Sequence, residues 1–153
     1  NLSMKQVLDI SVQICGMLEQ AHAKGAIYLD HKLLHYYWNE YRQKVIMLDW
    51  NIGHWLPETF SPEVQHSDMV QFSSRALHHI FTGRQAPGSV AVGPNRPEDI
   101  ANSPSRYKAS YSFDVQNRLN SEEMSFLESA LDGRFQTPTE MKDKLTYLYN
   151  KRQ

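Results

Sequence analysis

The sequence predicts a single, mainly helical domain whose few short β-strands are confined to its first third. Apolar residues recur at helical spacing near the N-terminus, and two later segments begin with helix-capping patterns. Short runs of aromatic and β-branched residues, which are typical of strands, are concentrated between positions 26 and 48. The 153 residues correspond to one domain, 1–153, which is long enough to bury a core without disulfides or metals.

The first element is a helix over residues 3–24. Ser3 and Gln6 form a capping box at its start, and Gly25 is a natural stop. The residues that share its apolar face are Val7, Ile10, Ile14, Leu18 and Ala21.

Three short strands follow this helix. Residues 26–28, 36–38 and 44–48 are rich in aromatic and β-branched side chains. The polar residues 39–43 between the last two strands predict a turn.

The remaining chain predicts helices and one long loop. A helix over 67–82 ends at Thr82-Gly83, and residues 86–113, rich in Pro, Gly, Ser and Asn, predict a loop with one short helix at 97–101. Asn120 with Glu123 starts another helix. Thr137-Pro138-Thr139-Glu140 starts the last one, with an N-cap, a first-turn proline and a reciprocal glutamate.

Composition excludes several classes of function. The formal net charge of −1 argues against nucleic-acid and membrane-surface binding, which need a basic excess. Cys15, the only cysteine, excludes an internal disulfide and fits a reducing, cytoplasmic setting. The sequence also contains no membrane-spanning run and no signal peptide. Because it begins with Asn1 rather than Met, we expect a segment of a longer polypeptide.

The segment 25–53 carries the residues best suited to chemistry. Asp30 and Lys32 follow one apolar run, and Asp49 follows a second run at 45–48. Carboxylates at the ends of two adjacent strands can converge on one point, where one orients a nucleophile and the other holds a metal ion. The spacing therefore indicates phosphoryl-transfer chemistry.

These residues and the motifs after them resemble the large C-terminal lobe of a Ser/Thr protein kinase over nearly the whole chain. Tyr28-Leu29-Asp30 resembles the family's His-Arg-Asp, with Lys32 in the place of its lysine and His35 in the place of a metal-binding asparagine. The later matches are Asp49-Trp50-Asn51 for Asp-Phe-Gly, Ser61-Pro62-Glu63 for Ala-Pro-Glu, Ser67-Asp68 for the start of the central helix, and Asp132-Gly133-Arg134-Phe135 for the turn before the last helix.

The resemblance implies structural roles for five residues. Glu63 and Arg134 are expected to form a partly buried ion pair, which can be bidentate. Asp68 is expected to accept the backbone N–H groups of the loop that carries Asp30. Tyr28 and Trp50 replace family His and Phe residues and are expected to keep their packing.

Departures from the family affect the chemical positions more than the structural ones. The sequence has no glycine-rich loop or Val-Ala-Ile-Lys strand to grip ATP. His35 replaces a hard oxygen ligand for magnesium, and Leu29 replaces the arginine that pairs with a phosphorylated activation loop. Tyr36, Tyr37 and Trp38 stand where the family has small aliphatic residues, so that Tyr37 is expected to fill part of the adenine site.

We therefore expect a catalytically impaired, pseudokinase-like lobe that serves as a protein-binding, scaffolding or regulatory module in signalling. Asp30, Lys32 and Asp49 are then remnants, no cofactor is bound, and a protein or intramolecular partner docks on Tyr36, Tyr37 and Trp38, at the face that the small lobe would cover. The alternative is the C-terminal half of an active ATP- and Mg-dependent Ser/Thr kinase. Asp49-Trp50 also resembles small-molecule kinases of the aminoglycoside phosphotransferase type, although Pro62-Glu63 and the Arg134 turn favour the protein-kinase branch.

The seven histidines raise a competing metal-site hypothesis. No cysteine partner or His-Glu-x-x-His pattern accompanies them. We therefore expect them to be ordinary surface or packed side chains.

Overall fold

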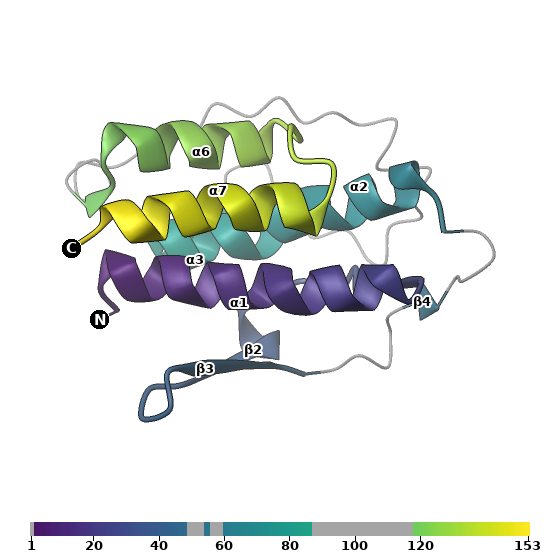
Figure 1. Cartoon of the computed structure of the whole chain (residues 1–153), viewed down its shortest axis with the longest axis horizontal. Helices are drawn as coiled ribbons and strands as arrows, with labels where there is room; N and C mark the ends of the chain where they lie inside the picture. The colour runs from purple at the N-terminus through teal and green to yellow at the C-terminus, as the bar shows by residue number, and fades with distance from the viewer. Residues whose placement is uncertain (1, 49–53, 56–59, 87–117) are drawn as a thin grey trace.

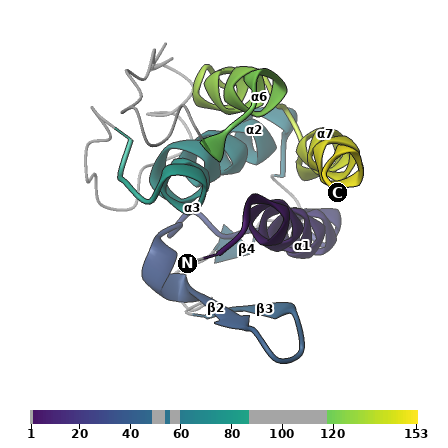
Figure 2. The same cartoon turned by 90° about the vertical axis from the view of Figure 1, so that its left-hand side faces the viewer.

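The computed structural model describes residues 2–48, 54–55, 60–86 and 118–153. Helices α1 (Met4–Ala23), α6 (Ser121–Leu131) and α7 (Pro138–Lys151) and the central segment from α2 (Pro62–Phe72) to α3 (His78–Thr82) lie roughly alongside one another (Figures 1 and 2). The hairpin of β2 (Tyr36–Asn39) and β3 (Lys44–Met47) lies beside α1, on the side away from α6 (Figures 1 and 2). The prediction of a mainly helical fold with a few short strands is confirmed. None of the described helices combines the length and the apolar character that crossing a membrane requires.

Helix α1 spans Met4–Ala23 and begins with the predicted capping box. The Ser3 hydroxyl accepts a hydrogen bond from Gln6 N, and the Gln6 side chain accepts one from Ser3 N. The helix ends before Gly25, whose φ of 78° lies in the left-handed region that glycine adopts without strain.

The strands form two separate antiparallel pairs. The hairpin joins β2 (Tyr36–Asn39) to β3 (Lys44–Met47), with Tyr37 opposite Ile46. The second pair joins β1 (Ala26–Ile27) to β4 (His54–Trp55), a strand that the sequence did not predict. The loop between β1 and β2 contains a 3-10 turn, η1 (Leu33–His35).

The central helical segment begins earlier than the sequence predicts. It consists of α2 (Pro62–Phe72), the π-helical turn η3 (Ser73–Leu77) and α3 (His78–Thr82). The predicted start at residue 67 is wrong because the Ser61 hydroxyl already accepts a hydrogen bond from Val64 N, with Pro62 at the first helical position. The predicted end is confirmed, since Gly83 takes a φ of 73°.

Helices α6 (Ser121–Leu131) and α7 (Pro138–Lys151) begin where the sequence predicts. Asn120 and Glu123 form the predicted capping box. At α7 the Thr137 hydroxyl caps Glu140 N, but Glu140 accepts from Gln136 N rather than from Thr137 N, so the predicted reciprocal bond is displaced by one residue. The predicted loop lies outside the described residues except for Ala86, and so does the predicted short helix at 97–101.

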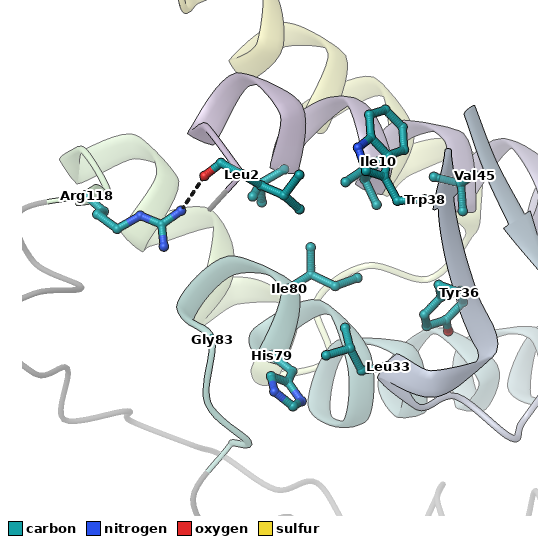
Figure 3. Close-up of a pocket in the computed structure, with 11 residues that line it drawn as sticks. Leu2, Ile10, Leu33, Tyr36, Trp38, Val45, His79, Ile80, Gly83 and Arg118 are labelled. Atoms are coloured by element: carbon teal, nitrogen blue, oxygen red, sulfur yellow. Dashed lines mark hydrogen bonds between the residues drawn. The ribbon is translucent and has the colours of Figure 1, made fainter. Parts of the chain in front are cut away.

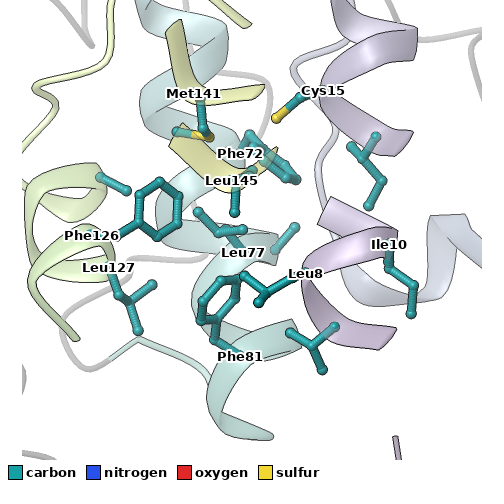
Figure 4. Close-up of a cluster of buried hydrophobic side chains, with 14 of the residues drawn as sticks. Leu8, Ile10, Cys15, Phe72, Leu77, Phe81, Phe126, Leu127, Met141 and Leu145 are labelled. Carbon is teal, nitrogen blue, oxygen red and sulfur yellow. The ribbon is translucent and has the colours of Figure 1, made fainter. Parts of the chain in front are cut away.

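The core lies between α1, α6, α7 and the central helical segment (Figure 4). Its fully buried members include Leu8, Phe72, Leu77 and Leu145. Burying each such side chain contributes about 1.5–3 kcal/mol to the free energy of unfolding. This packing fixes α2 relative to the β1–β2 loop, which carries the candidate site.

Candidate functional site

The buried side chain of Asp68 in α2 holds the loop between β1 and β2 in place. The Asp68 side chain is fully buried. Its two carboxylate oxygens accept hydrogen bonds from Tyr28 N at 3.1 Å and Leu29 N at 2.9 Å. Asp68 thus binds the backbone directly before Asp30, as the resemblance implies.

Two histidines complete the surroundings of Asp68. His22 Nε2 lies 2.6 Å from Asp68 Oδ2, and His31 Nε2 lies 2.6 Å from Oδ1, so each oxygen receives one backbone N–H and one imidazole. Burial alone would raise the pKa of Asp68, but His31 and His22 offset this effect and hold the pKa well below its usual value. The expectation of packed histidines fits both residues, although the sequence did not associate either with Asp68.

His31 also connects Asp68 to the hairpin. Its Nδ1 lies 2.6 Å from the Tyr36 hydroxyl. In the tautomer whose Nε2–H donates to Asp68, Nδ1 can accept a hydrogen bond from the Tyr36 O–H. Burial raises the pKa of Tyr36 well above its usual value, which keeps this hydroxyl protonated.

Nitrogen-bearing side chains surround Asp30. His35 Nδ1 lies 3.3 Å from its carboxylate and 2.8 Å from its backbone carbonyl, and Lys32 Nζ lies 4.0 Å from the carboxylate. Partial burial lowers the pKa of Arg75, and the negative charge of Asp30 opposes this effect, so Arg75 adds positive charge nearby. The preceding residue, Leu29, has a φ of 60°, a conformation that costs a non-glycine residue about 1 kcal/mol.

Sequence reasoning did not identify Arg75. It lies in the π-helical turn η3, a type of irregularity that is frequent at functional sites. The available signal was a single cation among the small and apolar residues of Ser73–Leu77.

The end of β3 lies against the same loop. The Tyr28 hydroxyl donates to Leu48 O, and Leu48 N donates to His35 O at 2.8 Å. Tyr28 is fully buried and packs against the rings of His31 and His35, which is the packing role expected of it. Asp49 and Trp50 lie outside the described residues, so the convergence of Asp49 with Asp30 stays a prediction.

The predicted partly buried ion pair between Glu63 and Arg134 is wrong. Glu63 lies in the exposed first turn of α2, and the Arg134 side chain is 72% exposed, 3.9 Å from Asp132. Among the ion pairs of the described residues, Glu63 does not occur. The turn before α7 is attached to α2 differently, because His66 Nε2 lies 2.6 Å from Gly133 O.

The three aromatic residues of the hairpin do not share one face. Side chains alternate along a strand, so Tyr37 points outward and is 56% exposed, whereas Tyr36 and Trp38 point inward and line a cavity (Figure 3). The prediction that all three present one docking face is therefore wrong for Tyr36 and Trp38. Tyr37, its cross-strand partner Ile46 and Leu48 form an exposed surface, here called the outer apolar face.

Metal binding receives no support from the described part of the chain, where no group of three or more His, Cys, Asp and Glu residues could hold an ion. His35 would contribute an imidazole nitrogen in place of the expected oxygen ligand, and its Nδ1 already faces Asp30. No protein-family model matches the chain, and no curated protein is significantly similar to it.

Proposed function

We propose that the chain is a kinase-like C-lobe that works as a protein-binding module. The arrangement of the β1–β2 loop supports this fold, since a buried aspartate of the next long helix accepts the N–H groups that precede Asp30. Strand β1 pairs antiparallel with β4, and the hairpin lies between these two strands in the sequence. This pairing adds support, because it brings the two ends of the segment 26–55 together. We place the module in the cytoplasm, on the basis of its single cysteine.

The surroundings of Asp30 favour binding over catalysis. A general base needs a carboxylate oxygen within hydrogen-bond reach of the substrate hydroxyl. His35 Nδ1 lies 3.3 Å from the Asp30 carboxylate, Lys32 and Arg75 add positive charge nearby, and the Asp30 side chain is only 20% exposed. Asp30 then organises the loop, and the proposed function needs no nucleotide.

The outer apolar face is the observation that carries the binding function. Tyr37, Ile46 and Leu48 are each about half exposed, at 56%, 50% and 46%, and adjacent on one surface of the hairpin. Contiguous exposed apolar surface commonly marks a protein–protein interface. A protein or another part of the same polypeptide docks there.

A paired substitution tests this function. The double variant Tyr37→Ala/Ile46→Ala is introduced into the full-length protein, and its partners in cells are identified by crosslinking and mass spectrometry. We expect the partner to be lost. Tyr41→Ala is the matched control, because Tyr41 is 96% exposed in the hairpin turn and lies outside the outer apolar face. If the double variant keeps the same set of partners as the wild type, the proposal is wrong.

A second candidate function is the C-terminal half of an active ATP-dependent Ser/Thr kinase. Lys32 favours it, because its side chain is 55% exposed and remains able to reach a phosphate group. Thermal melting of the full-length protein with ATP and magnesium or manganese separates the two functions, since a ligand that binds the folded state raises its melting temperature. A rise that Asp49→Asn abolishes would support the kinase, and no rise would support the binding module.

A further inference from the structure

A cavity of about 440 Å³ lies on the inner side of the hairpin (Figure 3). Three elements far apart in the sequence form its walls, namely α1, the hairpin and α3. Apolar side chains dominate the lining, among them Val7, Ile10, Trp38, Val45 and Ile80. The volume lies within the range of about 300–1,000 Å³ that is usual for ligand-binding pockets.

The interior of this cavity offers few polar groups to an occupant. The Tyr36 hydroxyl is turned toward His31, so the ring of Tyr36 is the part that contributes to the lining. Trp38 Nε1 is buried and finds no hydrogen-bond partner among the described residues. Apart from this one donor the lining is mainly apolar, so an occupant must present mainly apolar groups, because a polar group without a partner here would lose its hydrogen bonds to water.

Positive charge is located at one end of the cavity. The Arg118 guanidinium donates to Leu2 O at 3.1 Å and contacts Met4 Sδ at 3.8 Å, and within the described ranges it has no carboxylate partner. A cation held in place beside an apolar cavity favours an occupant that carries a carboxylate.

Exposed apolar side chains of η1 adjoin the cavity. Leu33 of η1 lines the cavity and is 40% exposed, and Leu34, the next residue, is 87% exposed. An extended occupant can contact these side chains as well as the cavity, whereas a compact small molecule would use only the cavity. This arrangement therefore favours a polypeptide segment.

We propose that the cavity receives a segment of a protein partner in which apolar side chains fill the space between α1, the hairpin and α3, and an adjacent Asp or Glu pairs with Arg118. This inference rests on the proposed function, since it assigns a second contact area to the same binding module. It differs from that function in its residues, because Tyr37, Ile46 and Leu48 do not line the cavity.

A phage-displayed library of random peptides, selected on the whole chain, is the probe. We expect the enriched peptides to combine apolar residues with an acidic residue. Arg118→Glu is expected to weaken binding of the synthesised peptide about tenfold or more, as loss of a charge-assisted contact should. Replacing the acidic residue of the peptide by Lys is expected to restore binding to that variant, and Arg84→Glu, an exposed control outside the lining, is expected to change nothing.

A second variant tests the apolar contact. Ile80→Asp places a carboxylate in the wall and is expected to abolish binding, with circular dichroism and melting showing whether the variant folds. If the Ile80→Asp variant does not fold, the test relies on Arg118→Glu and the peptide whose acidic residue is replaced by Lys. The inference is overturned if the library enriches no peptide, or if Arg118→Glu leaves the affinity of the enriched peptide unchanged. Because Tyr37→Ala/Ile46→Ala leaves the cavity wall intact, its effect on the cellular partner reports on the proposed function alone.

Discussion

His31 Nε2 lies 2.6 Å from Asp68 Oδ1, and this contact joins the β1–β2 loop to the buried face of α2. Neither side chain is exposed, with relative accessibilities of 0% for both. Because the backbone N–H of Leu29 shares the same oxygen, the contact fixes the main chain on one side of Asp30 and the imidazole on the other. Asp68 thus holds the loop through two backbone N–H groups and the imidazole of His31.

Removing the Asp68 carboxylate should destabilise the protein strongly. Asp68→Ala leaves two backbone N–H groups and two imidazoles buried without their acceptor. We expect the free energy of unfolding in urea to fall by about 3–5 kcal/mol. Asp143→Ala, at an exposed position of α7, is the control and should change it by less than about 0.5 kcal/mol. Equal effects of the two substitutions would contradict the assigned role.

The same carboxylate predicts a component of acid denaturation. The pKa of Asp68 is lower in the folded protein than the value of about 3.9 expected in the unfolded chain. The unfolded state therefore takes up the proton first as the pH falls, so this contribution is fully present above about pH 5 and is lost progressively at lower pH. Urea unfolding of the wild type and of Asp68→Asn between pH 2 and 6 measures it. We expect their difference in stability to shrink as the pH falls, and a constant difference would exclude the linkage.

Local sequence signals predicted the helix ends well and the tertiary pairings poorly. The capping boxes at Ser3 and Asn120 and the glycine stop at Gly83 depend on residues within one turn, and all are present. Strand β4 is two residues long and exists through its pairing with β1, which no local pattern reveals. The predicted start of the central helical segment at residue 67 is wrong because Ser61-Pro62 is the N-cap and first residue of α2, whereas from the sequence these residues are interpreted only as part of a motif like Ala-Pro-Glu.

The site shows the same division. The attachment to Asp68 of the loop from Tyr28 to His35 was implied by the resemblance to the kinase lobe, and it involves backbone N–H groups, which need an acceptor whatever the side chains are. The contributions of His22 and Arg75 could not be predicted, since they depend on which faces of two helices meet. The prediction of a Glu63–Arg134 ion pair is wrong for a related reason, because His66 rather than Glu63 faces the turn before α7.

The Cys15 thiol should report global unfolding. Cys15 is fully buried in α1, and burial raises the pKa of its thiol far above the usual range. We expect no reaction with a chromogenic disulfide reagent at neutral pH under native conditions, and one equivalent after denaturation. The rate should rise in parallel with the unfolded fraction measured by circular dichroism. Fast labelling of the native protein would show that α1 opens locally.

Two glycines provide a matched test of how the turn before α7 is held. Gly83 and Gly133 have nearly the same φ, 73° and 72°, so an alanine meets the same backbone strain at both positions. At Gly83 an added Cβ contacts nothing within 4 Å, whereas at Gly133 it would lie 3.3 Å from Val70 Cγ2 and 3.4 Å from His66 Nε2. We expect Gly83→Ala to lower the free energy of unfolding by about 1 kcal/mol, and Gly133→Ala by about 2 kcal/mol or more, because the crowding pushes His66 away from Gly133 O. Urea unfolding of both variants measures the difference. If the two costs are equal, backbone strain alone accounts for them, and the added methyl group does not disturb the contact between His66 and the turn.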